Sequence, residues 1–342
     1  MSPYTSARDE FTGAARAALD ANENPFGHPA VGGAWARYPD PHQRDLKELL
    51  AARHGLDPAQ LLVTNGSDEA IDLLVRAGCQ PGRDAILTAP PTYGMYAVTA
   101  AAHDVRVRPV PLTLPGFQPD VPALLAAIDE TTKLLFLTTP NNPTGNLLDA
   151  APIEALLRGF PGLVVLDEAY HEFATTPSWT TRLAEFPNLV VLQTLSKAWG
   201  LAGLRVGVLY AAPALVALLA KLKPPYNVSG VSQELAARAL ADPAAAAATI
   251  ARIRAERERL TTALTANSAV VEVLPSDANF LLVRLAVPAR PAYEALLTRG
   301  VVVRDRSREY GCADCLRVTV GTEAENDLLL RELAAVTAAL TT

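Results

Sequence analysis

Six short apolar runs, separated by segments long enough for helices, constrain the fold of this chain more than any other feature. The runs are QLLVT, DAILTA, KLLFLTT, GLVVLDE, NLVVLQT and VGVLY, and they lie between about residues 45 and 240. Uninterrupted runs of this kind are typical of strands that are buried on both faces of a sheet. Their alternation with helical segments predicts an α/β fold, a three-layer αβα domain whose sheet is mostly parallel and doubly wound.

The C-terminal part of the chain has a different pattern. Residues 244–268 form a long helical pattern rich in Ala and Arg, and the runs NFLLVRL, GVVVRD and CLRVTVG follow as predicted strands. A second helical pattern, ENDLLLRELAAVTAAL, comes after them. We therefore expect a large domain over residues 36–245 and a small α+β domain made of residues 1–35 and 246–342.

The charge balance and the apolar stretches narrow the class of function. The chain has 342 residues and a net charge of −6, without a tract rich in Lys or Arg, so we expect small-molecule chemistry and no nucleic-acid partner. The first residues, MSPYTSARDEFTG, carry no apolar signal segment, and the longest apolar stretch, YAAPALVALLA, is too short to cross a membrane. The sequence thus predicts a cytoplasmic protein that does not enter the membrane.

The cysteines and histidines predict no metal site. Cys79, Cys312 and Cys315 are an odd number, which fits a reducing compartment better than a disulfide framework. Cys312 and Cys315 have the CxxC spacing of zinc ligands, but no second CxxC or nearby histidine pair completes a tetrahedral set. The five histidines form no HExxH pair.

The stretch TLSKAWGLAGLRVG places Lys197 just after an apolar run and before a glycine-rich segment. Lys197 is therefore expected where a strand ends, and ligands bind at that edge of open α/β sheets. A lysine that is desolvated there can act as an amine nucleophile. The alternative is an ordinary exposed lysine in a loop.

Polar residues follow other predicted strands in the same way. Asp167 ends a fully apolar run, where a carboxylate is costly unless it meets a cation such as a pyridinium nitrogen. Tyr170 lies three residues further on, and Asn142 in TTPNNPTG can offer its amide to a ring oxygen.

A phosphate-binding pattern completes the set. Ser67 and Asp68 begin a predicted helix after a strand, where backbone N–H groups favour an anion, while Ser196 and Arg205 add a hydroxyl and a fixed positive charge. Each feature has a structural alternative: a helix cap, a structural ion pair or a tight turn. Because all of them recur at strand ends of one predicted sheet, we favour a single site that meets the needs of pyridoxal 5′-phosphate.

Eleven motifs carry a family resemblance that spans residues 19–326. They are LDANENPFG, RYPDP, GSDEAIDLL, PPTYGMY, NNPTG, DEAYHEF, TLSKAWGLAGLRVG, PPYNVS, ANFLLVR, GVVVRD and LRVTVGT. In this order they closely resemble the motifs of histidinol-phosphate aminotransferases, within the fold-type-I superfamily of pyridoxal-phosphate enzymes. The resemblance implies an aspartate-aminotransferase-like fold and transamination of L-histidinol phosphate with 2-oxoglutarate. The products are imidazole acetol phosphate and L-glutamate, in histidine biosynthesis.

The resemblance also implies residue roles. Lys197 would bind the cofactor covalently and move the substrate proton, Asp167 would keep the pyridine nitrogen protonated, and Tyr170 would complete the catalytic group. The implied cofactor-binding residues are Ser67, Asp68, Tyr93, Asn142, Asp167, Tyr170, Ser196, Lys197, Arg205 and, from a neighbouring subunit of a homodimer, Tyr38. The implied substrate-binding residues are Arg304, Arg317 and Asn22, with Arg317 binding the glutamate carboxylate and the substrate phosphate in turn.

Two departures from the family pattern and several alternative functions remain. The segment FGHPAVGGAWA is short, which predicts an abbreviated N-terminal lid, and Trp199 replaces the commoner Phe, which we interpret as neutral packing. An aromatic amino acid aminotransferase and a threonine-phosphate decarboxylase are built on similar motifs. A ligand-sensing regulator would need an added DNA-binding domain. A catalytically inactive scaffold is disfavoured by the intact Lys197, Asp167 and Arg205.

Overall fold

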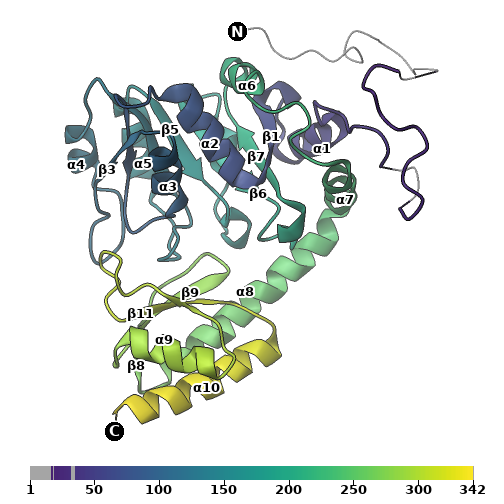
Figure 1. The fold of residues 1–342 in the computed structure, drawn as a ribbon. Helices are drawn as coiled ribbons and strands as arrows, with labels where there is room; N and C mark the ends of the chain where they lie inside the picture. The colour runs from purple at the N-terminus through teal and green to yellow at the C-terminus, as the bar shows by residue number, and fades with distance from the viewer. Residues whose placement is uncertain (1–16, 18, 32–34, 342) are drawn as a thin grey trace.

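The computed structural model describes residues 17, 19–31 and 35–341 of the chain. Figure 1 shows a large sheet with helices on both sides and a smaller sheet with its own helices below it. The long helix α8 (Pro243–Thr265) runs between the two parts.

The large sheet contains seven strands in the order β1-β7-β6-β5-β4-β2-β3. The strands are β1 (Leu61–Asn65), β2 (Ala85–Thr88), β3 (Arg106–Pro109), β4 (Thr132–Thr138), β5 (Leu163–Asp167), β6 (Leu189–Thr194) and β7 (Val206–Tyr210). β2 to β6 pair in parallel, whereas β7 runs antiparallel to both of its neighbours, β1 and β6. The six predicted strands and the mostly parallel fold class are confirmed.

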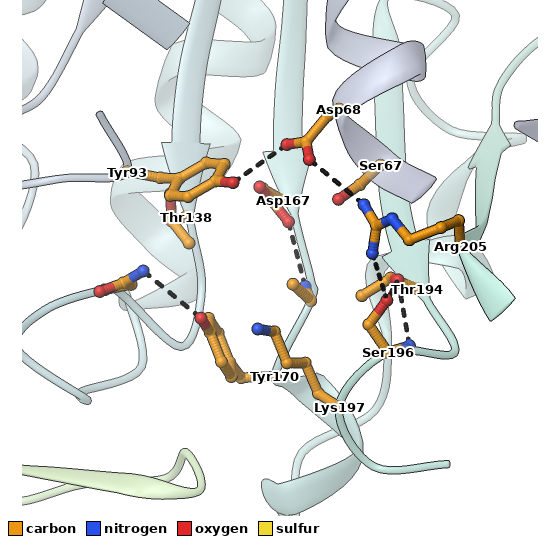
Figure 2. A pocket seen from close by; sticks show the side chains of 12 residues that line it. Ser67, Asp68, Tyr93, Thr138, Asp167, Tyr170, Thr194, Ser196, Lys197 and Arg205 are labelled. Atoms are coloured by element: carbon orange, nitrogen blue, oxygen red, sulfur yellow. Dashed lines mark hydrogen bonds and ion pairs between the residues drawn. The ribbon is translucent and has the colours of Figure 1, made fainter. Parts of the chain in front are cut away.

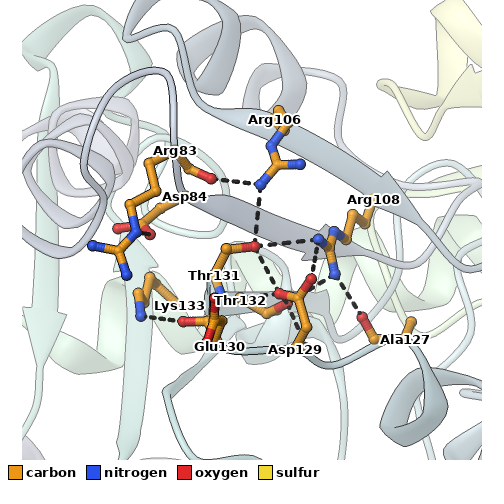
Figure 3. Close-up of polar contacts among 10 residues, drawn as sticks. All are labelled: Arg83, Asp84, Arg106, Arg108, Ala127, Asp129, Glu130, Thr131, Thr132 and Lys133. Atoms are coloured by element: carbon orange, nitrogen blue, oxygen red, sulfur yellow. Dashed lines mark hydrogen bonds and ion pairs between the residues drawn. The ribbon is translucent and has the colours of Figure 1, made fainter.

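The seventh strand, β3, was not expected from the sequence because it carries no continuous apolar run. β3 lies at the edge of the sheet, where charged side chains protect the open backbone. Figure 3 shows Arg106 donating to the carbonyl of Arg83 and Arg108 forming an ion pair with Asp129. Both arginines also donate to Thr131 Oγ1 at 3.2 Å, so the strand edge is tied to the start of β4.

Helices cover the two faces of the large sheet and define two cores. On one face lie α2 (Gly66–Gly78), α3 (Met95–Ala102) and α6 (Pro213–Ala220), and on the other α1 (Arg44–His54), α4 (Val121–Ala126), α5 (Ala150–Gly159) and α7 (Gly230–Leu240). Short 3₁₀ turns occur at Pro58–Gln60, His171–Phe173, Trp179–Arg182 and Ala202–Leu204. The three layers bring every parallel strand to one common carboxyl edge, which is where sites form in such sheets.

The small sheet is antiparallel and has the order β10-β11-β9-β8. Its strands are β8 (Val270–Val273), β9 (Phe280–Leu285), β10 (Arg304–Asp305) and β11 (Cys315–Thr319), and its helices are α9 (Ala289–Thr298) and α10 (Glu323–Thr341). One face of this sheet packs on α8, α9 and α10 through a continuous apolar core. The predicted helices and the strands NFLLVRL and CLRVTVG are present, but the strand predicted over GVVVRD forms only at Arg304–Asp305, and β8 and α9 were not foreseen.

The division into domains at residues 36–245 stays a prediction. α8 begins at Pro243, so the boundary at residue 245 lies within its first turn, and residues 1–16 lie outside the described part of the chain. The first residues, MSPYTSARDEFTG, for which no signal segment is expected, fall in the same undescribed segment. Within residues 17, 19–31 and 35–341, no helix combines the length and the apolar character that a membrane crossing requires.

Candidate active site

A pocket opens at the carboxyl ends of β4, β5 and β6, beside the first turn of α2. Its lining residues are Ser67, Asp68, Tyr93, Thr138, Asn142, Asp167, Ala169, Tyr170, Thr194, Ser196, Lys197 and Arg205. Figure 2 shows these side chains arranged around one open centre. The fold therefore brings together every sequence-predicted cofactor-binding residue except Tyr38, and it adds Thr138, Ala169 and Thr194.

Lys197 lies in the loop that follows β6, as its sequence position predicted. Its ammonium nitrogen is 5.6 Å from the centre of the Tyr170 ring, and the side chain points into the pocket (Figure 2). Backbone hydrogen bonds from Gly200 to Lys197 (3.1 Å) and from Leu201 to Leu195 (3.0 Å) hold the loop. Burial, followed by the positive charge of Arg317, lowers the pKa of Lys197. A lowered pKa favours the neutral, nucleophilic amine.

Asp167 is the last residue of β5 and only 3 % of its surface is exposed. Its Oδ2 accepts a hydrogen bond of 2.7 Å from Tyr96 OH, and its Oδ1 accepts one of 3.1 Å from the backbone N–H of Ala169. Burial raises the pKa of Asp167 to about 6. Among the described residues no Lys, Arg or His forms an ion pair with this carboxylate, so it is suited to a cationic group on a ligand.

The first turn of α2 and the Arg205 segment form an anion site. Arg205 Nη1 lies 3.4 Å from Ser196 Oγ, and its Nη2 lies 3.5 Å from Asp68 Oδ2. Gly66 has φ 72°, and a Cβ there would lie 2.6 Å from Arg205 Nη2; a Cβ on Gly207 would collide with the backbone of Gly66 and Ser67. Glycine at both positions therefore allows hydroxyls, helix N–H groups and a guanidinium to converge, as phosphate binding requires.

Two tyrosines border the pocket. Tyr93 OH donates to Asp68 Oδ1 at 3.0 Å, and burial is the main cause that raises the pKa of Tyr93. Asn142 Nδ2 donates to Tyr170 OH at 3.4 Å, and burial raises the pKa of Tyr170 to about 12. Both phenols therefore remain protonated near neutral pH and can donate hydrogen bonds to a ligand.

The small sheet reaches the pocket through Arg317. Arg304 on β10 lies directly opposite Arg317 on β11, and Arg317 Nη1 donates to Asn142 Oδ1. The Arg317 guanidinium also lies 5.3 Å from the centre of the Phe280 ring, which packs edge-on against Tyr170. The two predicted substrate arginines are thus neighbours, although only Arg317 contacts a residue that lines the pocket.

Tyr38 and Asn22 lie elsewhere in the described chain. They line a separate depression with Trp35 and Tyr226, between the N-terminal segment and the start of α7. Tyr38 is 51 % exposed and stacks on Tyr226 with a centroid distance of 4.5 Å. Within one chain, neither residue contributes to the pocket around Lys197.

The pocket fits pyridoxal 5′-phosphate on its own chemistry. An amine of lowered pKa, a buried carboxylate without a cationic partner in the described chain, and a phosphate site surround one space. The described residues contain no group of three or more His, Cys, Asp or Glu side chains arranged to hold a metal ion. Cys312 and Cys315 are free and fully buried, and burial raises the thiol pKa of each.

The fold and this site define a pyridoxal-phosphate-dependent aminotransferase. The family model of class I and II aminotransferases matches residues 4–333, and the chain belongs to that family. The chain is 48 % identical to a histidinol-phosphate aminotransferase of Parabacteroides distasonis, over 97 % of this chain and 94 % of that protein. The resemblance drawn from the sequence motifs is thereby confirmed.

Two solved structures extend the comparison. A histidinol-phosphate aminotransferase from Sinorhizobium meliloti, in complex with pyridoxal 5′-phosphate, has a TM-score of 0.83 and 29 % identity, covering 94 % of this chain and 90 % of that one. An L-threonine-O-3-phosphate decarboxylase from Porphyromonas gingivalis has a TM-score of 0.75 and 28 % identity, with coverage of 88 % and 90 %. Likeness in fold is therefore shared by enzymes with two reaction types.

Sequence reasoning missed two features of this site. Tyr96, the hydrogen-bond donor to Asp167, lies in the motif PPTYGMY beside the predicted Tyr93. The sequence carries a weak signal for it, because Tyr is an uncommon choice for a fully apolar core position. Trp199, interpreted as neutral packing, instead donates from Nε1 to Glu172 at 2.9 Å, a bond that phenylalanine cannot make.

Proposed function

We propose that this protein transfers the amino group of L-histidinol phosphate to 2-oxoglutarate, with pyridoxal 5′-phosphate as its cofactor. The observation that carries the proposal is that Lys197, Asp167 and the anion site at α2 line one pocket, which Arg317 reaches through Asn142. The high identity to a histidinol-phosphate aminotransferase over nearly the whole chain supports the substrate.

The cofactor would be held at three points by this chain. Ser67, Ser196 and Arg205 would bind its phosphate together with the N–H groups of α2. Asp167 would face the pyridine nitrogen, and Asn142 with Tyr170 would donate to the ring oxygen. Tyr93 would lie against the ring face, while Asp68 fixes the Tyr93 phenol. When bound, the cofactor supplies an electron-poor ring that stabilises negative charge developing at the substrate Cα.

Lys197 would perform the proton transfers. Its Nζ is an amine of lowered pKa, so it would remove the Cα proton of the amino donor and, in the second half-reaction, deliver a proton to the Cα of the glutamate that forms. The charge on Asp167 is stabilised by the Tyr96 hydrogen bond and would hold a proton on the pyridine nitrogen by charge attraction. Asp167 is buried and shielded from water, whereas Lys197 lies at the open side of the pocket, where a substrate can reach it.

Arg317 would bind the anionic ends of both substrates. Its guanidinium can accept the carboxylate of glutamate or the phosphate of histidinol phosphate in the same fork geometry. Arg304, opposite it across the strand pair, would add a second positive charge. The alternation of two anions on one site fits an enzyme that processes its two substrates in turn.

We also propose a cytoplasmic homodimer. Tyr38 and Asn22 lie away from the pocket of their own chain, and Leu19, Phe26 and Trp35 of the same segment expose 89, 90 and 47 % of their surface. A second copy that covers this segment would bury these side chains and bring Tyr38 to the neighbouring cofactor phosphate. Residues 36–245 would then form the cofactor-binding domain of each subunit, and residues 1–35 with 246–342 the small domain.

A half-reaction assay tests the proposal. The cofactor-loaded protein is mixed separately with L-histidinol phosphate, phenylalanine and O-phosphothreonine, while the cofactor absorbance and the released products are followed. We expect rapid amino transfer from histidinol phosphate and much slower transfer from phenylalanine. A preference for phenylalanine would assign an aromatic aminotransferase, and release of carbon dioxide from O-phosphothreonine would assign a decarboxylase.

A further inference from the structure

One face of the small sheet carries a positive charge in addition to the two arginines to which the proposed function assigns a role. Leu316 and Val318 of β11 point into the apolar core with α8, α9 and α10, so Arg317 between them faces the other way. Arg304 is paired with Arg317 and shares that face. Arg306 lies two residues after Arg304, and its backbone N–H donates to Cys315 at 2.9 Å, so the strand pairing continues and Arg306 falls on the same face.

The side chain of Arg306 is oriented by an ion pair but keeps one unused hydrogen-bond donor. Its Nη1 donates to Glu309 Oε1 at 2.6 Å, across a turn in which the Glu309 N–H donates to the Arg306 carbonyl at 3.0 Å. Arg306 Nε is buried and has no hydrogen-bond partner among the described residues. Only 26 % of the side chain is exposed, so this unused donor is a cost that a bound acceptor would remove.

Arg306 acts electrostatically on the site. After burial, its charge is the largest cause that lowers the pKa of Arg317, ahead of Arg304. It also helps to stabilise the ionised form of Tyr170, after Arg317 itself. Arg304 and Arg317 form no ion pair among the described residues, so Glu309 is the carboxylate paired with these three guanidinium groups. The face therefore has the charge excess that a phosphate dianion would neutralise and a single carboxylate would not.

We propose that Arg306, oriented by Glu309, is a third guanidinium of the substrate-phosphate site and makes this site select a phosphorylated amine over a dicarboxylate. The inference deepens the proposed function and rests on it for the identity of the substrate. Arg306 would donate from its unused Nε to a phosphate oxygen, beside Arg317 and Arg304. Glutamate, whose α-carboxylate needs only the Arg317 fork, would make little use of it.

The test compares Arg306→Gln and Arg306→Lys with the matched control Arg331→Gln. Arg331 lies on α10, which packs on the opposite face of the small sheet, is 67 % exposed and pairs with Glu332, so its loss removes one positive charge outside the proposed site. For each cofactor-loaded variant, half-reaction rates give the apparent dissociation constants of L-histidinol phosphate and of L-glutamate. Calorimetry gives the dissociation constant of inorganic phosphate, and thermal unfolding confirms that the variant is folded.

We expect Arg306→Gln to raise the dissociation constants of histidinol phosphate and inorganic phosphate about tenfold, because one charge-assisted hydrogen bond is lost. The dissociation constant of glutamate should change less than about twofold. Arg306→Lys keeps the charge, so its dissociation constants should fall between those of Arg306→Gln and the unaltered protein, and Arg331→Gln should match the unaltered protein. Equal weakening of glutamate and histidinol phosphate by Arg306→Gln, or no change in either, would overturn the inference.

Failure of the proposed function is recognised separately. If the unaltered protein does not transfer the amino group of histidinol phosphate, the proposed function is wrong. The phosphate measurement then decides the role of Arg306 alone. Tighter phosphate binding by the unaltered protein than by Arg306→Gln supports the inference, and equal binding, including none by either protein, contradicts it.

Discussion

The phenol of Tyr96 donates a hydrogen bond of 2.7 Å to Oδ2 of Asp167, the carboxylate that faces the centre of the pocket. Tyr96 lies in the first turn of α3, is fully buried and stacks on Phe136 with a centroid distance of 4.7 Å. Its hydroxyl is also 2.8 Å from Thr138 Oγ1. Because burial disfavours the charged carboxylate, this donor is what partly offsets the rise in the pKa of Asp167.

Replacing Tyr96 with Phe should therefore weaken cofactor binding. The variant keeps the aromatic packing but removes a hydrogen bond to a charged group, so the cofactor dissociation constant should rise about tenfold. Absorbance titration of the cofactor-free variant measures it. Tyr210→Phe is the matched control, because Tyr210 OH is buried without a hydrogen-bond partner among the described residues. Equal cofactor affinity in Tyr96→Phe and the unaltered protein would show that this hydrogen bond does not support Asp167.

Lys197→Ala should retain some bound cofactor and lose transamination. The anion site and Asp167 remain, but the amine that moves the proton is gone, so turnover should fall by about a thousandfold or more. Borohydride reduction of the unaltered holoenzyme followed by peptide mapping should place the cofactor on the peptide that contains Lys197. Lys221→Ala, at an exposed position at the end of α6, is the control. Labelling of another lysine, such as Lys223, would contradict the assignment.

Trp199→Phe should cost about 1–3 kcal/mol of unfolding free energy, because it leaves Glu172, whose side chain is 11 % exposed, without its indole donor. Among the described residues, the cation nearest to Glu172 is then Arg53, at 3.9 Å. Denaturant unfolding of the holoenzyme measures the loss. The same substitution should cost much less when Glu172 is already Gln. Trp179→Phe is the control, because no carboxylate in the described part of the chain accepts from the Trp179 indole, and the backbone N–H that donates to Glu168 is kept. An equal loss of unfolding free energy with Glu172 and with Gln at that position would mean that the indole N–H does not stabilise the carboxylate, and that Trp199 serves only for packing.

Local patterns explain how much of the molecule could be predicted. Lys197, Asp167 and the α2 anion site follow from short runs that end at one sheet edge, so each could be placed from its own neighbourhood in sequence. Tyr96 is 71 residues from Asp167, and their meeting depends on how α3 packs against the sheet. No rule of local sequence spacing predicts a contact between residues so far apart in the sequence.

The arginines and Trp199 show the same limit. Arg306 could be assigned to the face of Arg317 only after the register of β10 and β11 was known, since a shift of one residue would reverse its direction. The interpretation of Trp199 as neutral packing considered its size and not its N–H, whose partner lies 27 residues earlier. Polar partnerships between distant segments are therefore what the sequence left open.

A complementation experiment tests the role of Tyr38. If Tyr38 acts in the neighbouring subunit, a hybrid dimer of Tyr38→Ala and Lys197→Ala chains contains one site with both residues intact. Mixing the two variants after subunit exchange should therefore restore activity, up to about a quarter of the unaltered protein for random pairing. Sedimentation analysis gives the oligomeric state in parallel. An active monomer, or mixed variants no more active than either alone, would argue against a shared site.

His54 should make the protein less stable in mild acid. Burial lowers the pKa of His54 to about 4, so between its ordinary pKa of 6.5 and about 4 the unfolded chain binds a proton that the folded chain does not. His54 therefore does not lower the unfolding free energy above pH 6.5. As the pH drops through that window, its protonation in the unfolded chain lowers the unfolding free energy by at most about 3 kcal/mol. His54→Asn keeps an acceptor near Thr180 Oγ1, which lies 3.2 Å from His54 Nδ1, but cannot titrate. Denaturant titration at pH 7.5, 5.5 and 4.5 measures the unfolding free energy of both proteins. The difference between them isolates the effect of His54 from that of the carboxylates, which both proteins share. Asp167 is one of these, and its raised pKa changes the stability in the opposite direction. That difference should shift in favour of His54→Asn as the pH falls. A constant difference across the three pH values would mean that His54 takes up its proton equally in both states.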